Sequence, residues 1–355
     1  MAVTVGLEIG GSAVRGAVVD SSRGKHLVRR FGEMPIPTGA VQAGEVFDED
    51  AVIEAVSALF KRHKLPKKRV VIGTANQRIV VRQVDVPQMD DSEMREALPF
   101  QVQDSLPIAV EDAVLDYVPL EEFVTPEGEP MQSILVVAIG REVVDTLVRI
   151  ADGAGIGLTA IDLQPFGLVR AVVSVAPMVG SPTNAVVDIG RSMTQVVIAQ
   201  GGVARFVRLL PRGGDDFTQA LVETLEVDEE TAEEMKKTVG VAPDEMPDGI
   251  DDTASAQRAL TRIADGLIDE LRGSMSFFRS QAENVEIEKL IVAGNAARLP
   301  HLANRMGRVL GLPIAPAKIL DYVETGRVQM SDEELQAAQP VLPSAVGLGL
   351  WGVGL

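Results

Sequence analysis

The sequence predicts a mixed α/β protein in which two related halves enclose a ligand cleft. The first observation is a repeated pattern, at residues 7–12 and again at 187–192: a buried strand with an acidic residue, then a glycine turn with a hydroxyl. The second is that each half opens with antiparallel strands and then alternates strands with helices, an order typical of a mixed sheet covered by helices. The third is size, because 355 residues of which 46% are hydrophobic suffice for two cores.

The composition excludes several classes of protein. The chain has no cysteine, so disulfides and thiolate metal sites are absent. With a formal net charge of −18 and no basic region evident, we expect no nucleic-acid partner. The amino terminus enters its first strand at once and no apolar stretch is long enough to span a bilayer, so we expect neither a signal peptide nor a membrane span. These features favour a cytoplasmic protein.

Hydrophobic periodicity predicts the elements of the first half. Asp48 is a candidate N-cap for the first helix, and Pro99 should break or kink the second. We expect strands at 3–9, 14–20, 26–34, 69–74, 78–86, 113–120, 133–139 and 156–162, and helices at 48–64, 90–105, 141–153 and 164–175.

The second half should begin after a linker at 180–183. The carboxy-terminal segment should fold back onto the first domain. In between, we expect strands at 185–189, 194–200, 203–210 and 289–293, a helical region at 215–239, a polar loop at 242–252, and helices at 253–282 and 298–310.

The first repeat carries residues suited to phosphate. Gly10, Gly11 and Ser12 form a tight turn whose backbone N–H groups can approach phosphate oxygens. Arg15 adds positive charge, and Glu8 can orient metal-bound water. Taken alone, this pattern favours a plain hairpin with a surface arginine.

The second repeat strengthens that interpretation. Asp188 lies in a strand expected to be buried, where an unpartnered carboxylate is costly. A backbone cap would satisfy it, and so would a magnesium–water shell. The magnesium–water shell is favoured because two such turns can clamp a phosphate chain from opposite sides. This turn carries Gly190, Arg191, Ser192 and Thr194.

A third glycine turn closes a strand and opens a helix. Gly213 and Gly214 precede Asp215, and backbone N–H groups at a helix start form an anion site. The alternative is an ordinary N-cap by Asp215 or Asp216.

Two further segments suit a nucleoside. A strand ends at Gly294 and Asn295, before a helix near Arg298, and such a turn can lie flat against a purine. Glu233 and Lys236 share one helix face at i, i+3 spacing, from which they could reach ribose and base. On its own, that face would be an ordinary solvated one.

These elements, in this order, resemble the actin-like ATPase superfamily, which includes actin, Hsp70, sugar kinases and the division protein FtsA. Residues 8–12, 188–194 and 292–295 match its two phosphate motifs and its adenosine motif, and 213–217 resembles an Hsp70-type phosphate-side loop. Within the superfamily the chain most resembles the PilM family of type IV pilus assembly proteins, by segments 84–89, 216–221 and 272–281.

The resemblance implies an actin-like fold: two RNase H-like domains, an interdomain nucleotide cleft, and a displaced subdomain of the FtsA type, called 1C. Subdomain 1A would be completed by about 164–183 and 320–355, and subdomain 2A by 287–319. The expected ranges are 1–77 for 1A, 78–163 for 1C, 184–212 for 2A and 213–286 for 2B.

The resemblance also implies function. The cleft would bind ATP with Mg²⁺, held through water by Glu8 and Asp188, and Gln164 matches a water-positioning residue. The partner would be the amino-terminal cytoplasmic tail of a PilN-like inner-membrane protein, bound between 1A and 1C. Membrane association would then be indirect, and self-association is left open.

Departures from the superfamily pattern predict slow ATP hydrolysis at most. Glu8 replaces the usual aspartate, Arg191 and Met193 intrude in the second phosphate motif, and Gln195 stands at its last carboxylate position. The alternatives are an FtsA-like division protein and a small-molecule kinase. The first is disfavoured because the tail at 347–355 has no basic residue to favour membrane binding. The second lacks an assignable base.

Overall fold

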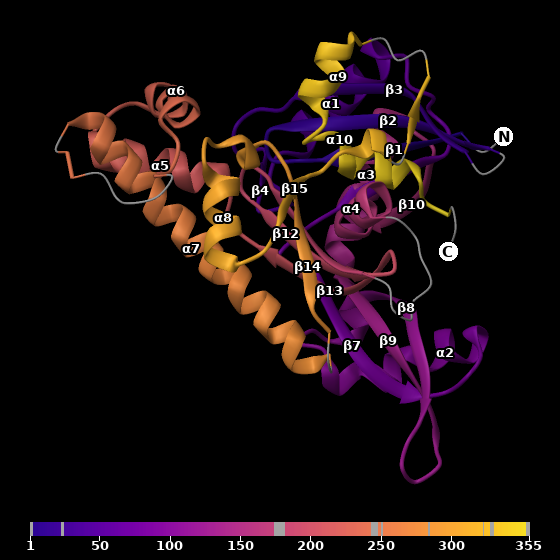
Figure 1. Cartoon of the computed structure of the whole chain (residues 1–355). Coiled ribbons are helices and arrows are strands. Elements are labelled where there is room, and N and C mark those ends of the chain that lie inside the picture. Colours follow the sequence, from indigo (N-terminus) through magenta and orange to yellow (C-terminus); the bar gives the residue numbers. More distant parts are fainter. Residues whose placement is uncertain are drawn as a thin grey trace.

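The computed structural model describes residues 3–22, 25–173, 182–242, 248–249, 251–282, 285–321, 323–326 and 330–352 (Figure 1). Half of the predicted linker at 180–183, part of the polar loop at 242–252 and the end of the 347–355 tail lie outside these residues. No helix among the described residues is long and apolar enough to cross a bilayer.

The sequence repeat corresponds to a repeat of sheet topology. In each domain three antiparallel strands are followed by two strands parallel to the first. The first sheet is ordered β10 (Leu158–Leu163), β6 (Val70–Thr74), β1 (Val3–Ile9), β2 (Ala13–Ser22), β3 (Lys25–Pro35) and β16 (Glu324–Thr325). The second is ordered β13 (Val203–Leu210), β12 (Thr194–Gln200), β11 (Thr183–Ile189), β14 (Ile287–Ala293) and β15 (Ile314–Pro316).

Helices cover both faces of these sheets, which is why the central strands are continuous apolar runs. Helices α1 and α3 share one core with the first sheet, and α5, α7 and α8 share another with the second. Asp48 caps α1 as predicted, accepting from the backbone N–H of Ala51. The bounds are α1 (Glu49–Arg62), α3 (Arg141–Ala154), α5 (Gly214–Leu225), α6 (Glu229–Val239), α7 (Asp252–Gln281), α8 (Leu302–Leu310) and α9 (Asp332–Ala338).

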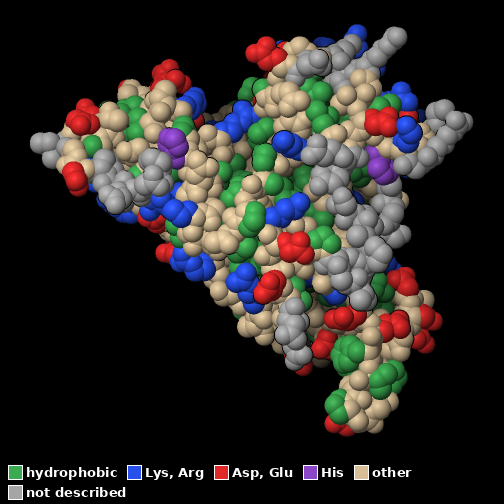
Figure 2. Space-filling view, viewed as in Figure 1, with side chains coloured by type: hydrophobic (Ala, Val, Ile, Leu, Met, Phe, Trp, Pro, Cys, Tyr) green, Lys and Arg blue, Asp and Glu red, His purple; other side chains and the backbone are tan. Residues whose placement is uncertain are grey.

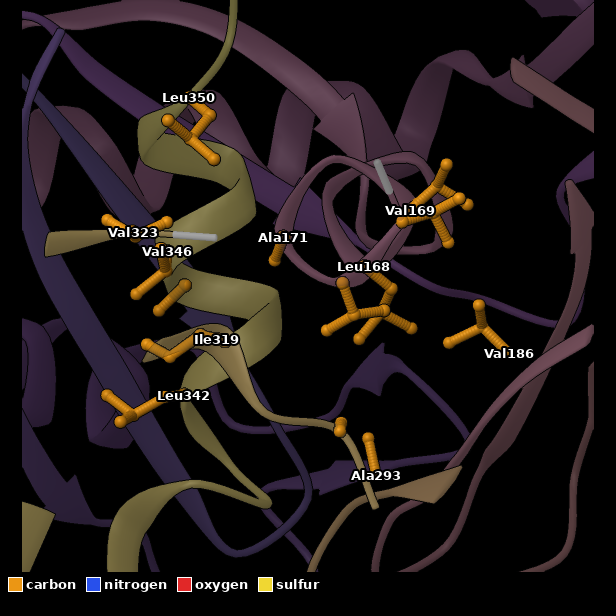
Figure 3. Close-up of a cluster of buried hydrophobic side chains, with 14 of the residues drawn as sticks. Leu168, Val169, Ala171, Val186, Ala293, Ile319, Val323, Leu342, Val346 and Leu350 are labelled. Atoms are coloured by element: carbon orange, nitrogen blue, oxygen red, sulfur yellow. The ribbon is translucent and has the colours of Figure 1, made fainter. Parts of the chain in front are cut away.

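Two helices fill the space between the sheets (Figure 3). These are α4 (Gln164–Val172) and α10 (Leu342–Gly349), the latter from the carboxy-terminal segment that folds back onto the first domain, as predicted. Leu168 of α4 and Val346 of α10 belong to one buried cluster with Val186 of the second sheet. The two helices approach closely because Gly347 meets Gly167: a Cβ at Gly347 would lie 1.7 Å from the Gly167 carbonyl oxygen.

A separate three-stranded sheet forms the lower part of the molecule in Figure 1. Its order is β7 (Val80–Pro87), β9 (Pro130–Gly140) and β8 (Ala113–Val124), with α2 (Asp91–Val102) packed on one face. Val86, from the segment that resembles the PilM family, is buried in this small core. The segment therefore contributes to the core of this sheet.

The structure corrects several expected boundaries. Helix α2 continues three residues past Pro99, because Met94, Leu98 and Val102 pack in the core and hold its last turn. The helix expected from 298 begins at Leu302, because His301 has a left-handed backbone (φ 67°) that interrupts it. The expected helical region 215–239 divides into α5 and α6.

The short hairpin of β4 (Val41–Gln42) and β5 (Glu45–Val46) was not expected. Its turn at Ala43 and Gly44 has left-handed backbone angles at both residues. A Cβ at Gly44 would lie 1.6 Å from the Ala75 carbonyl oxygen, so only glycine fits this turn.

The glycine contact between α4 and α10 predicts a position-specific stability effect. Gly347→Ala places a methyl group on the Gly167 backbone and should lower the free energy of unfolding by about 3 kcal/mol or more. Gly273→Ala on α7 is the matched control, because a Cβ at this glycine would meet no atom within 4 Å. It should raise stability by about 0.5–1 kcal/mol. Urea unfolding curves measure both, and a Gly347→Ala protein that unfolds at the wild-type urea concentration would contradict this packing.

Candidate functional site

The two repeated turns meet at one cavity between the domains. Glu8 lies near the end of β1, opposite Arg15 on β2, and Asp188 lies near the end of β11, opposite Gln195 on β12. The equivalent registers place both carboxylates near the carboxyl-terminal ends of their strands, β1 and β11. The cavity measures about 60 Å³ and is lined by Glu8, Gly10, Gly11, Ser12, Arg15, Gly44, Gln164, Asp188, Gly190, Arg191, Ser192, Gln195, Gly294 and Asn295, among others.

Arg15 is the buried counter-charge of this cavity. Its Nη1 donates to Glu8 Oε1 at 3.1 Å and its Nε donates to Glu33 Oε2 at 2.6 Å. Burial raises the pKa of Glu8, while the charge of Arg15 opposes that rise. Glu8 Oε2 and Gln195 Oε1 are buried and have no hydrogen-bond partner in the described part of the chain. Both atoms belong to cavity-lining residues.

Asp188 is buried without an ion pair of its own among the described residues. Burial and the negative charge of Glu8 raise its pKa to about 7, against the opposing effects of Arg15 and of the Ser344 hydroxyl. Ser344 Oγ donates to Asp188 Oδ2 at 3.4 Å.

Two contacts close the cavity across the domain boundary. Gln195 Nε2 donates to Gln164 Oε1 at 2.9 Å, and the Ala43 backbone N–H donates to Ser192 Oγ at 3.1 Å. Gln164 Nε2 donates to the carbonyls of Ile9 and Gly73 at 3.4 and 3.3 Å, so both of its amide hydrogens are engaged. Its Oε1 accepts from Gln195 and keeps one further lone pair.

A second and larger cavity of about 880 Å³ adjoins the first. This volume is within the usual range for ligand pockets. Lys236 lines it, and its Nζ contacts Glu233 Oε2 at 2.5 Å and Thr218 Oγ1 at 2.7 Å. Of the predicted nucleotide residues, the structure gathers here Ser12, Gly190, Arg191, Gly214, Asp215, Glu233, Lys236, Asn295 and Arg298.

Two predicted residues lie outside both cavity linings. Thr194 is fully buried and its hydroxyl donates to the Arg212 carbonyl at 2.8 Å. Gly213 is itself the N-cap of α5, so the expected N-cap by Asp215 or Asp216 is wrong; Asp216 instead accepts from the Gly213 N–H through Oδ2 at 2.7 Å, from the third helical position. Their roles here are to hold the turns.

Arg191 lines both cavities. Its Nε donates to Asp215 Oδ1 at 2.8 Å, and its Nη1 donates to Thr38 Oγ1 of the first domain at 3.3 Å. Burial raises the pKa of Asp215 while the charge of Arg191 opposes the rise. Arg191 therefore bridges the domains and also faces any anion bound between the turns.

The residues present fit a hydrated magnesium ion with a phosphate chain. Magnesium keeps most of its waters and typically uses one or two carboxylates, and the partnerless Glu8 Oε2 and the unpaired Asp188 supply such acceptors. No three His, Cys, Asp or Glu side chains form a candidate metal site within the described ranges.

Sequence reasoning missed the β4–β5 hairpin as part of the site. Gly44 lines the small cavity, and its carbonyl accepts from Asn76 Nδ2 at 3.3 Å. Glu45 pairs with Arg78 at the start of the 78–163 segment, at 3.0 Å. The local signal was only a glycine in a polar stretch, and the contacts that matter are made by residues distant in sequence.

Comparison with known proteins identifies relatives. A sequence model of the family described as type IV pilus assembly protein PilM matches residues 6–353. A solved PilM–PilN type IV pilus biogenesis complex contains a chain that superimposes with a TM-score of 0.83 at 26% identity, covering 99% of both chains.

More distant relatives share the fold. Cell division protein FtsA of Bacillus subtilis is 24% identical over 265 residues, covering 67% of this chain and only 58% of FtsA. MreB 5 of Spiroplasma citri bound to AMPPNP has a TM-score of 0.52 at 14% identity, covering 89% of this chain and 91% of MreB 5. The predicted actin-like fold is thereby confirmed.

The buried Asp188 predicts a pH-dependent stability difference. Because its pKa rises from 3.8 to about 7 on folding, the folded state holds the proton more tightly, and ionisation destabilises the fold as pH rises between those values. Asp188→Asn removes this penalty. Its Tm advantage over wild type should be small at pH 5 and reach several degrees at pH 8, measured without nucleotide or magnesium. Asp85→Asn, at an exposed position, is the control. A pH-independent difference would contradict the assignment.

Proposed function

Because the chain belongs to the PilM family of type IV pilus assembly proteins, we propose that it is an ATP-binding scaffold of pilus assembly that captures the cytoplasmic amino-terminal tail of a PilN-like membrane protein. In this role it would lie at the inner face of the cytoplasmic membrane. The observation that carries the nucleotide part is the pair of equivalent phosphate turns, which bring Glu8 and Asp188 to one cavity.

ATP would bind with its phosphates between the turns and its nucleoside in the larger cavity. Arg15 would supply charge to the phosphates, and Glu233 and Lys236 would face ribose and base. Magnesium, when bound, neutralises phosphate charge, and Glu8 and Asp188 would hold its water shell. Entry requires the turns to separate, because a Cβ at Gly11 would lie only 3.0 Å from Ser192 Oγ.

Hydrolysis is expected to be slow. The amides of Gln164 and Gln195 line the small cavity, and an amide can orient water but cannot accept its proton as a carboxylate can. Glu8 is already paired with Arg15. This chemistry suits a nucleotide-dependent switch better than a kinase, and the family match favours pilus assembly over an FtsA-like role in division.

Tail binding is proposed at the boundary of 1A and 1C, with Phe47 as the anchor. This ring is 65% exposed, next to two ion pairs that join 1A to the 78–163 segment: Glu45 with Arg78, and Glu49 with Arg149. Exposed aromatic side chains are enriched at binding sites and often dominate their energetics.

The charge of subdomain 1C supports this partner. Residues 78–140 contain 13 Asp and Glu against 3 Lys and Arg, a net charge of −10. Acidic side chains are prominent on the lower part of the molecule in Figure 2, over β8 and its surroundings. Cytoplasmic segments of membrane proteins carry an excess of Lys and Arg, so the charges are complementary.

The β4–β5 hairpin offers a physical link between the two sites. Ala43 touches Ser192 of the second domain, Gly44 is held by Asn76, and Glu45 pairs with Arg78. Separation of the turns by a nucleotide would break the Ala43–Ser192 contact and free the hairpin. The boundary near Phe47 would then change with the state of the cleft.

The proposed nucleotide site predicts an effect on MgATP binding. Asp188→Ala should weaken binding of MgATP by about 10- to 100-fold, the range of a lost charge-assisted contact, with a smaller effect on ATP in EDTA. Isothermal titration calorimetry measures both, with the exposed Asp85→Ala as control. A wild-type protein that gives no heat with MgATP would refute the nucleotide assignment.

The proposed tail site predicts an effect on peptide binding. Phe47→Ser should weaken binding of a synthetic PilN-type amino-terminal peptide by about 10- to 100-fold, as expected for a hot-spot aromatic residue. Phe277→Ser is the matched control, since Phe277 is 51% exposed on α7 of the second domain. Fluorescence anisotropy measures both affinities. Equal losses for the two variants, or none for Phe47→Ser, would place the tail elsewhere.

A further inference from the structure

One loop departs from the acidic character of the chain. Six of the nine residues from 61 to 69 are Lys or Arg, and a seventh is His63. This basic loop runs from the last turn of α1 to the start of β6. All six cationic side chains belong to exposed residues. The expectation from sequence that the chain has no basic region is therefore wrong here.

The basic loop lies away from the nucleotide cleft. It immediately precedes β6, which is parallel to β1, whereas the phosphate turn follows the opposite end of β1. Lys67 Nζ donates to the Ala154 carbonyl at the end of α3, at 3.2 Å, and Arg30 donates to the Lys64 carbonyl. The loop is thus fixed beside α3, which shares a core with α1 and the first sheet.

Packing accounts for only part of this charge. Lys61 and Arg62 complement the carboxyl-terminal dipole of α1, and Lys67 caps α3. Lys64, Lys68 and Arg69 have no such role.

Acidic neighbours do not neutralise the loop either. None of its six cationic side chains forms an ion pair with any residue that the structure describes. Acidic side chains of the adjoining strands already have other partners, Asp20 with Arg29, Glu33 with Arg15 and Glu324 with Lys25.

We propose that the basic loop binds the anionic phospholipid headgroups of a membrane surface. Clusters of four to eight flexible basic residues adsorb to such surfaces without a shaped pocket. Protein interfaces are instead depleted in Lys and enriched in aromatic residues, and the loop has four Lys and no exposed aromatic residue. Nucleic acid is a polyanion as well, and the vesicle experiment below separates it from lipid.

Such binding would orient the molecule. The basic loop would face the membrane while the acidic 1C sheet, with its net charge of −10 over residues 78–140, would be repelled from it. Lipid contact would add to tail capture through a raised effective concentration, although the lipid proposal stands without the tail. The contact would be weak and sensitive to salt.

The test is sedimentation with vesicles of phosphatidylcholine containing about one third phosphatidylglycerol, which is an anionic surface of the required kind. Lys61→Gln, Lys64→Gln and Lys68→Gln are combined in one variant, which leaves Lys67 in place. The control removes the same charge from exposed, scattered sites by Arg262→Gln, Arg279→Gln and Lys318→Gln. Wild type and control should bind, and the loop variant should bind roughly 100-fold more weakly. Binding should also disappear with pure phosphatidylcholine and at high salt.

Three results would overturn the proposal. One is wild-type protein that binds anionic and neutral vesicles alike, and another is a control that loses as much binding as the loop variant. The third is wild-type protein that ignores both vesicles but is bound, through this loop, by a single-stranded oligonucleotide or by polyglutamate. Thermal unfolding verifies that each variant is folded. Tail-peptide affinity should be the same in the loop variant and wild type, which separates this proposal from tail capture.

Discussion

The cleft between the domains is built around two buried carboxylates, Glu8 and Asp188, and one buried arginine, Arg15. Glu8 and Asp188 come from equivalent strands of the duplicated sheets, so the topology itself forces them together at the domain boundary. Only Glu8 is directly paired with Arg15, and Asp188 responds by holding a proton up to a pKa of about 7. A cation arriving with a phosphate chain would satisfy both carboxylates, which makes the cleft a natural binding site and a point where ligand can change the domain arrangement.

Few polar contacts close the cleft, and each is a hydrogen bond that a ligand or water could take over. The Gln164–Gln195, Ala43–Ser192 and Arg191–Thr38 hydrogen bonds join the domains, while α4 and α10 provide the larger apolar contact behind them. Because Gly167 and Gly347 meet backbone to backbone, that apolar contact is fixed in place. Movement is therefore expected at the turns and at the β4–β5 hairpin rather than in the central core.

Charges of opposite sign lie on different parts of the molecular surface. The acidic 1C sheet suits a basic tail, and the basic loop at 61–69 suits an anionic surface. A basic loop resting on an anionic membrane would turn the acidic sheet away from that membrane.

Local sequence signals predicted most of the fold and the turns of the site. The bounds of β1 and β12 follow from runs ended by glycine, the end of β13 follows from Pro211, and the cap at Asp48 follows from its side chain. Local signals failed where tertiary contacts decide, as at Pro99 in a well-packed helix. The Gln164–Gln195 hydrogen bond joins residues of different domains, and no local sequence signal predicts that they meet. The basic loop was missed for another reason, because a net charge sums over regions of opposite sign.

The central claim is that the nucleotide cleft and the tail site are coupled. The most direct measurement is the affinity of a PilN-type tail peptide for the protein without nucleotide, with MgADP and with a non-hydrolysable MgATP analogue. The account predicts at least about a fivefold difference between the nucleotide-free and analogue-bound states, and an equal change in analogue affinity when the peptide is bound, because coupling is reciprocal. Identical peptide affinities in all three states, with nucleotide binding verified, would contradict it.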